Sequence, residues 1–180
     1  MGRPEVRTVV LYEDQEQETF LRRLVKRLGF RPERYENCRN NAGVLQRLGV
    51  EVDALRERNF QKNVCLVVMI DADDEDHHGR VKELLDRIAS DASTGARKDG
   101  ERVALLVPAW EIENWYVHLC IPEARPIDEG KDYKPTPEWR ELAKDLGAAA
   151  KRAVEAWAPE PGRTDPPSLT AARAELGRAQ

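Results

Sequence analysis

The sequence lacks long apolar runs: none approaches the length of about 20 residues that a membrane-spanning helix needs. We therefore expect no membrane partner. Cysteine is also scarce: Cys38, Cys65 and Cys120 are odd in number and widely scattered. A disulfide framework or a zinc knuckle uses more cysteines at defined spacing. We therefore expect reduced thiols, packed within a protein of the cytoplasm.

Two further absences narrow the function. Residues 1–5 have no apolar core of the kind found in signal peptides, so we expect no export. The chain has no Gly-x-x-x-x-Gly-Lys loop, so an ATPase activity would have to come from a partner subunit. The net charge of −4 argues against binding of nucleic acid through bulk positive charge, although metal ions or a local basic patch can still hold a phosphate backbone.

What is present indicates one globular domain. The chain has 180 residues, of which 41% are hydrophobic and 34% charged. Short β-branched apolar runs predict buried strands at residues 8–12, 64–70 and 103–107, with a weaker strand at 34–38. Apolar residues at helical spacing predict helices over residues 16–29, over 44–60 and around 81–88. Strands that alternate with helices predict an α/β fold with a mostly parallel sheet of about four strands, flanked by helices.

The C-terminal part has a different pattern. We expect a short helix at residues 113–119, a proline-rich loop at 121–136, a helix over 137–157 and a last helix capped by Ser168. These segments predict an α/β domain over residues 1–135. The helical C-terminal extension, residues 136–180, is expected to pack on that domain.

Acidic residues follow each of the strongest predicted strands. Glu13 follows the first, Asp71 and Asp73 follow the central one, and Glu111 and Glu113 lie just beyond the last. Ligands of open α/β sheets bind at the carboxyl ends of the strands, where these acids would meet. Clustered carboxylates repel one another unless a cation neutralises them, and Mg²⁺ or Mn²⁺ prefers such oxygen ligands. The alternative is that each acid merely caps the following helix.

The Asp-x-Asp spacing adds a geometric expectation. Alternate residues of an extended strand point the same way, so Asp71 and Asp73 are predicted to face one metal while Ala72 packs behind them. Residues 74–78 extend the acidic run, and we expect a solvated loop that caps the next helix. His118 is expected to be a packed or surface histidine, with orientation of a substrate as the alternative.

Several segments together resemble a TOPRIM (topoisomerase–primase) domain. That family places a Glu after its first strand, before a helix with a Phe-Leu pair, and an Asp-x-Asp after a later strand. The matching segments are residues 10–13 (VLYE), 20–21 (FL), 70–73 (IDAD), 107–115 (VPAWEIENW) and 118–119 (HL). The last two are similar to an element of small TOPRIM-like proteins related to OLD-type nucleases, many of them linked to bacterial anti-phage defence. The resemblance covers roughly residues 7–119 and departs at Asp14, where many members carry Gly.

The resemblance implies cleavage of DNA or RNA phosphodiesters with Mg²⁺ or Mn²⁺. By this resemblance Asp71 and Asp73 bind metal, Glu13 is a ligand or general base, and Glu111 or Glu113 completes the shell. Lys131 or Lys134 would neutralise the phosphate, with a solvated loop lysine as the alternative. The implied partners are the nucleic acid and either an ATPase subunit or a second copy of the chain.

Two other functions stay open. One is a TOPRIM-like subunit without catalysis in a larger defence complex. The other is a signalling receiver domain phosphorylated on Asp71, because residues 12–14 (YED) before a helix also resemble the start of such a domain. Receivers need a lysine at the end of the last strand, and residues 103–111 contain none, which disfavours this function.

Overall fold

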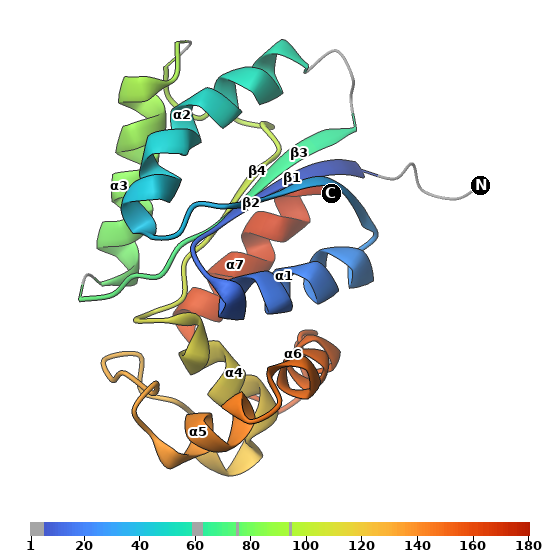
Figure 1. The fold of residues 1–180 in the computed structure, drawn as a ribbon, viewed down its shortest axis with the longest axis vertical. Helices are drawn as coiled ribbons and strands as arrows, with labels where there is room; N and C mark the ends of the chain where they lie inside the picture. Colours follow the sequence, from blue (N-terminus) through green and yellow to red (C-terminus); the bar gives the residue numbers. More distant parts are fainter. Residues whose placement is uncertain (1–5, 59–62, 75, 94) are drawn as a thin grey trace.

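The computed structural model describes residues 6–58, 63–74, 76–93 and 95–180. Its four strands form one sheet, all parallel, in the order β2-β1-β3-β4. Helices cover both faces (Figure 1), so the predicted α/β class is confirmed. The elements are β1 (Val6–Tyr12), α1 (Gln15–Arg27), β2 (Phe30–Asn37), α2 (Asn41–Glu57), β3 (Val64–Met69), α3 (His77–Asp91), β4 (Val103–Leu106), α4 (Ile112–Cys120), η1 (Pro122–Ala124), α5 (Pro137–Ala143), α6 (Leu146–Glu155) and α7 (Pro167–Ala179).

Burial explains which strands the sequence showed clearly. Every residue of β3 and β4 is buried, as expected for strands covered on both faces. Strand β2 lies at the edge of the sheet and is largely polar, and its pairing with β1 is interrupted between Thr8 and Val9. The expected strand at 34–38 is therefore present as β2, but the strand begins earlier than expected, at Phe30. The expected helix over 44–60 begins earlier, at Asn41, because the Asn40 side chain accepts a hydrogen bond from the amide of Gly43 at 2.9 Å; residues 59 and 60 lie outside the described residues.

The sheet separates two apolar cores. Val9 and Leu11 of β1 face α2 and α3, whereas Val10 and Tyr12 face α1 and the C-terminal helices. This alternation follows from the period of two residues in a strand. Figure 1 shows α2 and α3 on one side of the sheet and α1 with α7 on the other. The helices after residue 136 share the second core with β1 and α1.

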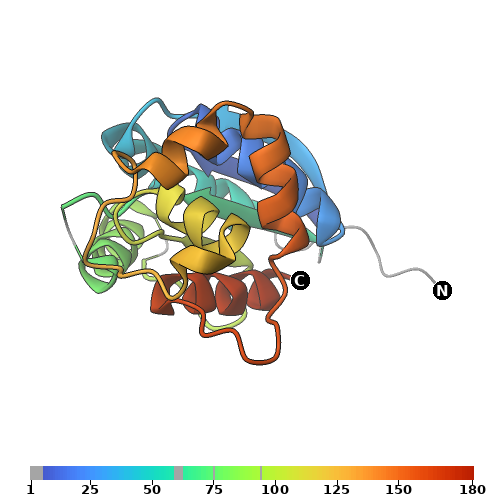
Figure 2. The same cartoon turned by 90° about the horizontal axis from the view of Figure 1, so that it is seen from below.

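The predicted helix over 137–157 is two helices, α5 and α6, separated at Lys144 and Asp145. The carboxylate of Asp145 accepts a hydrogen bond from the amide of Ala148 at 2.9 Å and starts α6. The predicted inner residues Trp139 and Trp157 are both buried. Figure 2 shows these helices grouped with α4, and α7 beside them.

The predicted role of Ser168 as a helix cap is wrong. Helix α7 begins at Pro167, and Ser168 is fully buried, with its hydroxyl accepting a hydrogen bond from Trp115 Nε1 at 2.8 Å. Helix α7 packs along β4, where Glu175 Oε2 accepts a hydrogen bond from the amide of Leu105 at 3.1 Å. This contact satisfies a donor on the outer edge of β4 that would otherwise invite another strand.

The three cysteines are free; Cys65 is buried, and Cys38 and Cys120 are partly buried. Within the described ranges, no helix is both long enough and apolar enough to cross a bilayer.

Candidate metal centre

Glu13 and Asp71 lie side by side at the carboxyl ends of the adjacent strands β1 and β3. The backbone amide of Asp71 donates a hydrogen bond to Glu13 Oε1 at 2.7 Å. Asp71 is buried, with only 6% of the residue exposed. The parallel register of β1 and β3 thus joins two acids that are far apart in the sequence.

A buried amide from α1 supports this pair. Gln17 is fully buried, and its Oε1 accepts a hydrogen bond from the amide of Glu13 at 3.0 Å. The backbone amide of Gln17 donates a hydrogen bond to Asp14 Oδ1 at 2.9 Å, so Asp14 caps α1. Capping of the following helix was the alternative explanation for acids at strand ends. Asp14 has this role, whereas Glu13 does not. Sequence reasoning missed Gln17, although a glutamine one turn before the apolar pair Phe20 and Leu21 was a usable signal.

Asp73 departs from the expected strand geometry. Its φ of 52° is left-handed, as is the φ of 60° at Trp110, and the amide of Asp73 donates to the carbonyl of Trp110 at 2.9 Å. Such conformations are costly for residues other than glycine and cluster at functional sites. The prediction that Asp71 and Asp73 face one metal while Ala72 packs behind them is therefore wrong: Ala72 is buried, but in the core formed with α2 and α3, the helices that also hold Asp73.

The carboxylate of Asp73 lies at the rim of the site and is 43% exposed. Its Oδ2 accepts a hydrogen bond from Asn41 Nδ2 at 3.0 Å and lies 3.6 Å from Arg80 Nη2. These two neighbours hold Asp73 from α2 and α3. Neither was singled out from the sequence, because nothing in their local patterns distinguishes them from surface residues of a helix.

Glu111 and Glu113 come from the start of α4. Glu111 occupies the N-cap position, but its side chain makes no capping hydrogen bond, so capping does not account for it. Glu113 is 1% exposed. Lys134 Nζ lies 2.9 Å from Glu111 Oε1 and 3.6 Å from Glu113 Oε1. Of the two lysines proposed from the sequence, Lys134 reaches the acids, whereas Lys131 lies over the ring of Tyr133.

Asn114 fixes the loop that carries Lys134. This residue is fully buried in α4, its Nδ2 donates to the carbonyl of Lys131 at 2.9 Å, and its Oδ1 accepts from the amide of Tyr133 at 3.0 Å. The proline-rich loop is thereby tied to the helix that supplies Glu113. Asn114 was missed because its partners are backbone atoms of a segment without a recognisable pattern.

The acids form one electrostatic unit. Burial, followed by the negative charges of Glu13, Glu113 and Asp14, raises the pKa of Asp71 well above its usual value. Burial raises the pKa of Glu13 to about 7, while the hydrogen bond from the Asp71 amide opposes this shift. Burial also raises the pKa of Glu113 to about 7, with Lys134 opposing. Bringing these groups together without a cation therefore disfavours their charged forms.

Several carboxylate oxygens of the cluster have no hydrogen-bond partner in the part of the chain that the structure describes. These buried oxygens are Asp71 Oδ1, Glu111 Oε2 and both side-chain oxygens of Glu113. A buried polar atom without a partner is unfavourable. An all-oxygen donor set of this kind suits a hard divalent cation, so the residues fit Mg²⁺ or Mn²⁺.

The side chains are nevertheless not arranged as a finished ligand set. Among the described residues, no group of three or more His, Cys, Asp or Glu side chains is placed to hold one metal ion. Lys134 provides the positive charge next to Glu111 and Glu113 instead. Metal binding at this cluster would require side-chain rotation and displacement of the lysine.

The neighbouring polar residues have structural roles. Asp76 caps α3 through the amide of Gly79 at 2.7 Å, as expected for this loop, and His77 Nδ1 lies 2.8 Å from the carbonyl of Val107. Glu75 lies outside the described residues. His118 is fully buried and its Nε2 lies 2.9 Å from Asp165 Oδ1, so it is a packed histidine.

Comparison with known proteins yields no relative: no family model, no curated protein and no solved structure matches the chain.

Proposed function

We propose that the protein is a divalent-metal-dependent nuclease of the TOPRIM type, which cleaves phosphodiester bonds of nucleic acid in the cytoplasm and acts in bacterial anti-phage defence. The observation that carries this proposal is the convergence of Glu13, Asp71 and Glu113 in a buried cluster with unpartnered oxygens. The resemblance of the surrounding segments to TOPRIM domains supplies the reaction class.

The proposed roles follow from burial and position. Asp71 and Glu113, which carry buried oxygens without partners, would be the inner metal ligands. Glu13 has a pKa of about 7, which suits a general base that accepts a proton from the attacking water near neutral pH. A bound Mg²⁺ would polarise the phosphate and lower the pKa of its bound water.

The outer residues would handle the substrate. Asp73 lies at the exposed rim, fixed by Asn41 and Arg80, and would complete the metal shell on the side from which the nucleic acid approaches. Glu111 would be a further ligand of this shell. Lys134, once displaced from Glu111 by the metal, would neutralise the phosphate oxygens.

One observation favours a second candidate function. Because Lys134 already forms ion pairs with Glu111 and Glu113, the cluster is partly neutralised without a metal. This arrangement supports a TOPRIM-like subunit that lacks catalysis and acts within a complex, through a partner ATPase or a second copy of the chain. A receiver domain is disfavoured for a structural reason. The sheet of a receiver has a fifth strand next to the fourth, whereas in this protein α7 covers the outer edge of β4, where that strand would pair.

The test compares Mn²⁺-dependent cleavage of DNA and of RNA by the wild type, Asp71→Asn and a matched control, Asp86→Asn. Asp86 is an exposed residue of α3 that forms an ion pair with Lys82. We expect cleavage by the wild type and by the control and a loss of at least about 100-fold in Asp71→Asn. Equal activity in all three proteins would remove Asp71 from the mechanism. Metal binding without cleavage in the wild type would select the second candidate.

A further inference from the structure

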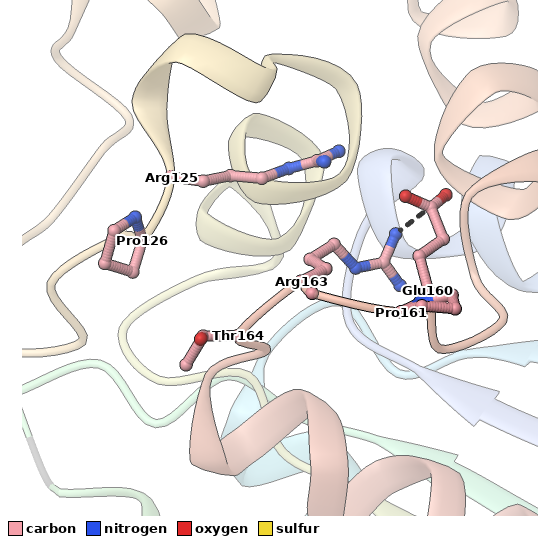
Figure 3. Close-up of a pocket in the computed structure, with 7 residues that line it drawn as sticks. Arg125, Pro126, Glu160, Pro161, Arg163 and Thr164 are labelled. Atoms are coloured by element: carbon pink, nitrogen blue, oxygen red, sulfur yellow. Dashed lines mark ion pairs between the residues drawn. The ribbon is translucent and has the colours of Figure 1, made fainter.

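An open cavity of about 360 Å³ lies at the end of α4 opposite to the acidic cluster. It is lined by Arg125 and Pro126, which follow η1, and by the turn of residues 160–164 before α7. Figure 3 shows the side chains of Arg125 and Arg163 entering from these separate segments. A nine-residue helix is about 13 Å long, so this cavity is separate from the candidate metal centre.

Arg163 is the buried cation of this cavity. Its side chain is only 3% exposed, Nε donates to Asp165 Oδ1 at 2.7 Å, and Nη2 donates to the carbonyl of Ala158 at 2.6 Å. Nη1 is buried and makes no hydrogen bond within the described residues. The nearest acceptor is Glu160 Oε1, 3.2 Å away, in an ion pair that lacks hydrogen-bond geometry, so an external oxygen placed in line with the N–H group would satisfy it better.

Arg125 adds a second positive charge. Its Nε donates to the carbonyl of His118 at 2.6 Å and its Nη2 to the carbonyl of Leu119 at 2.9 Å. Both partners are carbonyls of the last turn of α4, so the negative end of the helix dipole compensates the charge of Arg125 only in part. Arg173 of α7 does not line the cavity, but it contacts Asp165 and brings the positive charges of this region to three.

Two carboxylates oppose these three cations. Asp165 is held by Arg163 and Arg173, and Glu160 lies with Oε1 3.2 Å from Arg163 Nη1, without the geometry of a hydrogen bond. The side chain of Glu160 is 53% exposed and stands on the surface turn. We interpret Glu160 as a loosely held internal anion in the position where an external one would bind.

We propose that this cavity binds the phosphate group of a small phosphomonoester or of inorganic phosphate, between the guanidinium groups of Arg125 and Arg163, in competition with Glu160. The planar fork of a guanidinium group matches the oxygens of a phosphate, and charge-assisted hydrogen bonds of this kind are strong. The site goes beyond the proposed nuclease function and does not depend on it.

The test is calorimetric titration of inorganic phosphate into the metal-free protein in the presence of a chelator. Glu160→Gln removes the competing charge on an exposed residue with little effect on folding. Glu141→Gln is its matched control, because Glu141 is an exposed helix residue that pairs with Lys144, away from the cavity. We expect Glu160→Gln to bind phosphate about threefold or more tightly than the wild type, and Glu141→Gln to bind it like the wild type.

A second variant tests the cation. Arg125→Gln, introduced into the Glu160→Gln protein, should weaken phosphate binding by about tenfold or more. If it does not fold, as judged by thermal unfolding, the comparison of Glu160→Gln with Glu141→Gln decides alone. Absence of phosphate binding by Glu160→Gln, or binding no tighter than that of the wild type and the control, would overturn the proposal.

Two further arms separate the sources of phosphate and the two proposals. Tighter binding of a nucleoside monophosphate or a 5′-phosphorylated oligonucleotide than of inorganic phosphate would support the site and identify a phosphomonoester as its ligand; equal binding would support the site and identify free phosphate. Asp71→Asn should bind phosphate like the wild type, because the metal centre is elsewhere. Tighter phosphate binding by Asp71→Asn than by the wild type would place the anion at the acidic cluster, where the substitution removes a repelling charge, and would overturn the cavity site.

Discussion

The amide of Asp71 donates a hydrogen bond to Glu13 Oε1 at 2.7 Å, although 58 positions separate the two residues in the sequence. This contact places a half-buried acid of one strand against a buried acid of its neighbour. The carboxylate of Asp71 is left with an oxygen that has no partner among the described residues. The cluster is therefore unfavourable without a cation, and several consequences can be measured.

Asp71→Asn should stabilise the metal-free protein. At pH 7.5 the substitution removes a buried acid whose charged form is disfavoured by burial and by Glu13 and Glu113. We expect a gain of about 1 kcal/mol in the free energy of unfolding, or about 2–4 °C in the midpoint of thermal unfolding. The same variant should show no further stabilisation by Mn²⁺. A lower midpoint than that of the wild type would mean that the Asp71 carboxylate is well satisfied as it stands.

The stability of the metal-free protein should fall as pH rises from about 5 to 8, as far as these acids determine it. The pKa values of Glu13 and Glu113 are raised from 4.5 to about 7 in the folded state. The folded protein therefore binds more protons than the unfolded chain, so the contribution of both groups is complete below pH 4.5 and is lost as pH rises through about 7.

Urea unfolding at pH 5.5, 7.0 and 8.5, with and without Mg²⁺, checks this dependence. The stabilisation by Mg²⁺ should grow with pH, because protons and metal compete for the same oxygens. Glu113→Gln should reduce that growth. A stabilisation by Mg²⁺ that is independent of pH would contradict binding at these carboxylates.

Lys134→Gln should bind Mn²⁺ more tightly than the wild type. The lysine occupies the side of Glu111 and Glu113 that a metal would use, and these acids raise its pKa, so it stays charged. Removing it should increase the affinity for Mn²⁺ about threefold to tenfold, as measured by calorimetry. Lys131→Gln, in the same loop but against Tyr133, is the control and should leave the affinity unchanged. Weaker binding by Lys134→Gln would show that the lysine organises the site and does not compete for it.

Gly49→Ala should destabilise the fold by about 1–3 kcal/mol. Helices α2 and α3 approach each other closely at this glycine, and an added Cβ would lie 2.8 Å from Cβ of Asp91 and 3.0 Å from its carbonyl carbon. Gly177→Ala in α7 is the control, since its added Cβ would meet nothing within 4 Å and alanine favours a helix by about 1 kcal/mol. Chemical denaturation of the two variants should therefore shift in opposite directions, and a shared direction would refute the close packing of α2 on α3.

The sequence predicted the layer order because β3 and β4 are buried on both faces and thus uniformly apolar. It underestimated β2, where an edge position permits polar residues. The break between α5 and α6 was not visible, because Asp145 caps a new helix without disturbing the spacing of apolar residues. Burial of Ser168 depends on the distant Trp115, which no local pattern could show.

The candidate site, like the fold, has one part that was predictable from the sequence and one part that was not. The approach of Glu13 to Asp71 follows from parallel strands and was predictable. The left-handed backbone of Asp73 depends on its pairing with Trp110 across the loop, and the ion pairs of Lys134 depend on a proline-rich loop held by Asn114. These contacts are tertiary, so neither spacing nor composition could indicate them.

The most direct test of the metal centre is anomalous diffraction from crystals of the wild-type protein soaked in Mn²⁺. We expect an anomalous peak within about 2.5 Å of carboxylate oxygens of Asp71 and Glu113, with Lys134 turned away from Glu111. Manganese bound only elsewhere, or a soaked crystal in which Lys134 still contacts Glu111 and no peak lies at the acids, would contradict it.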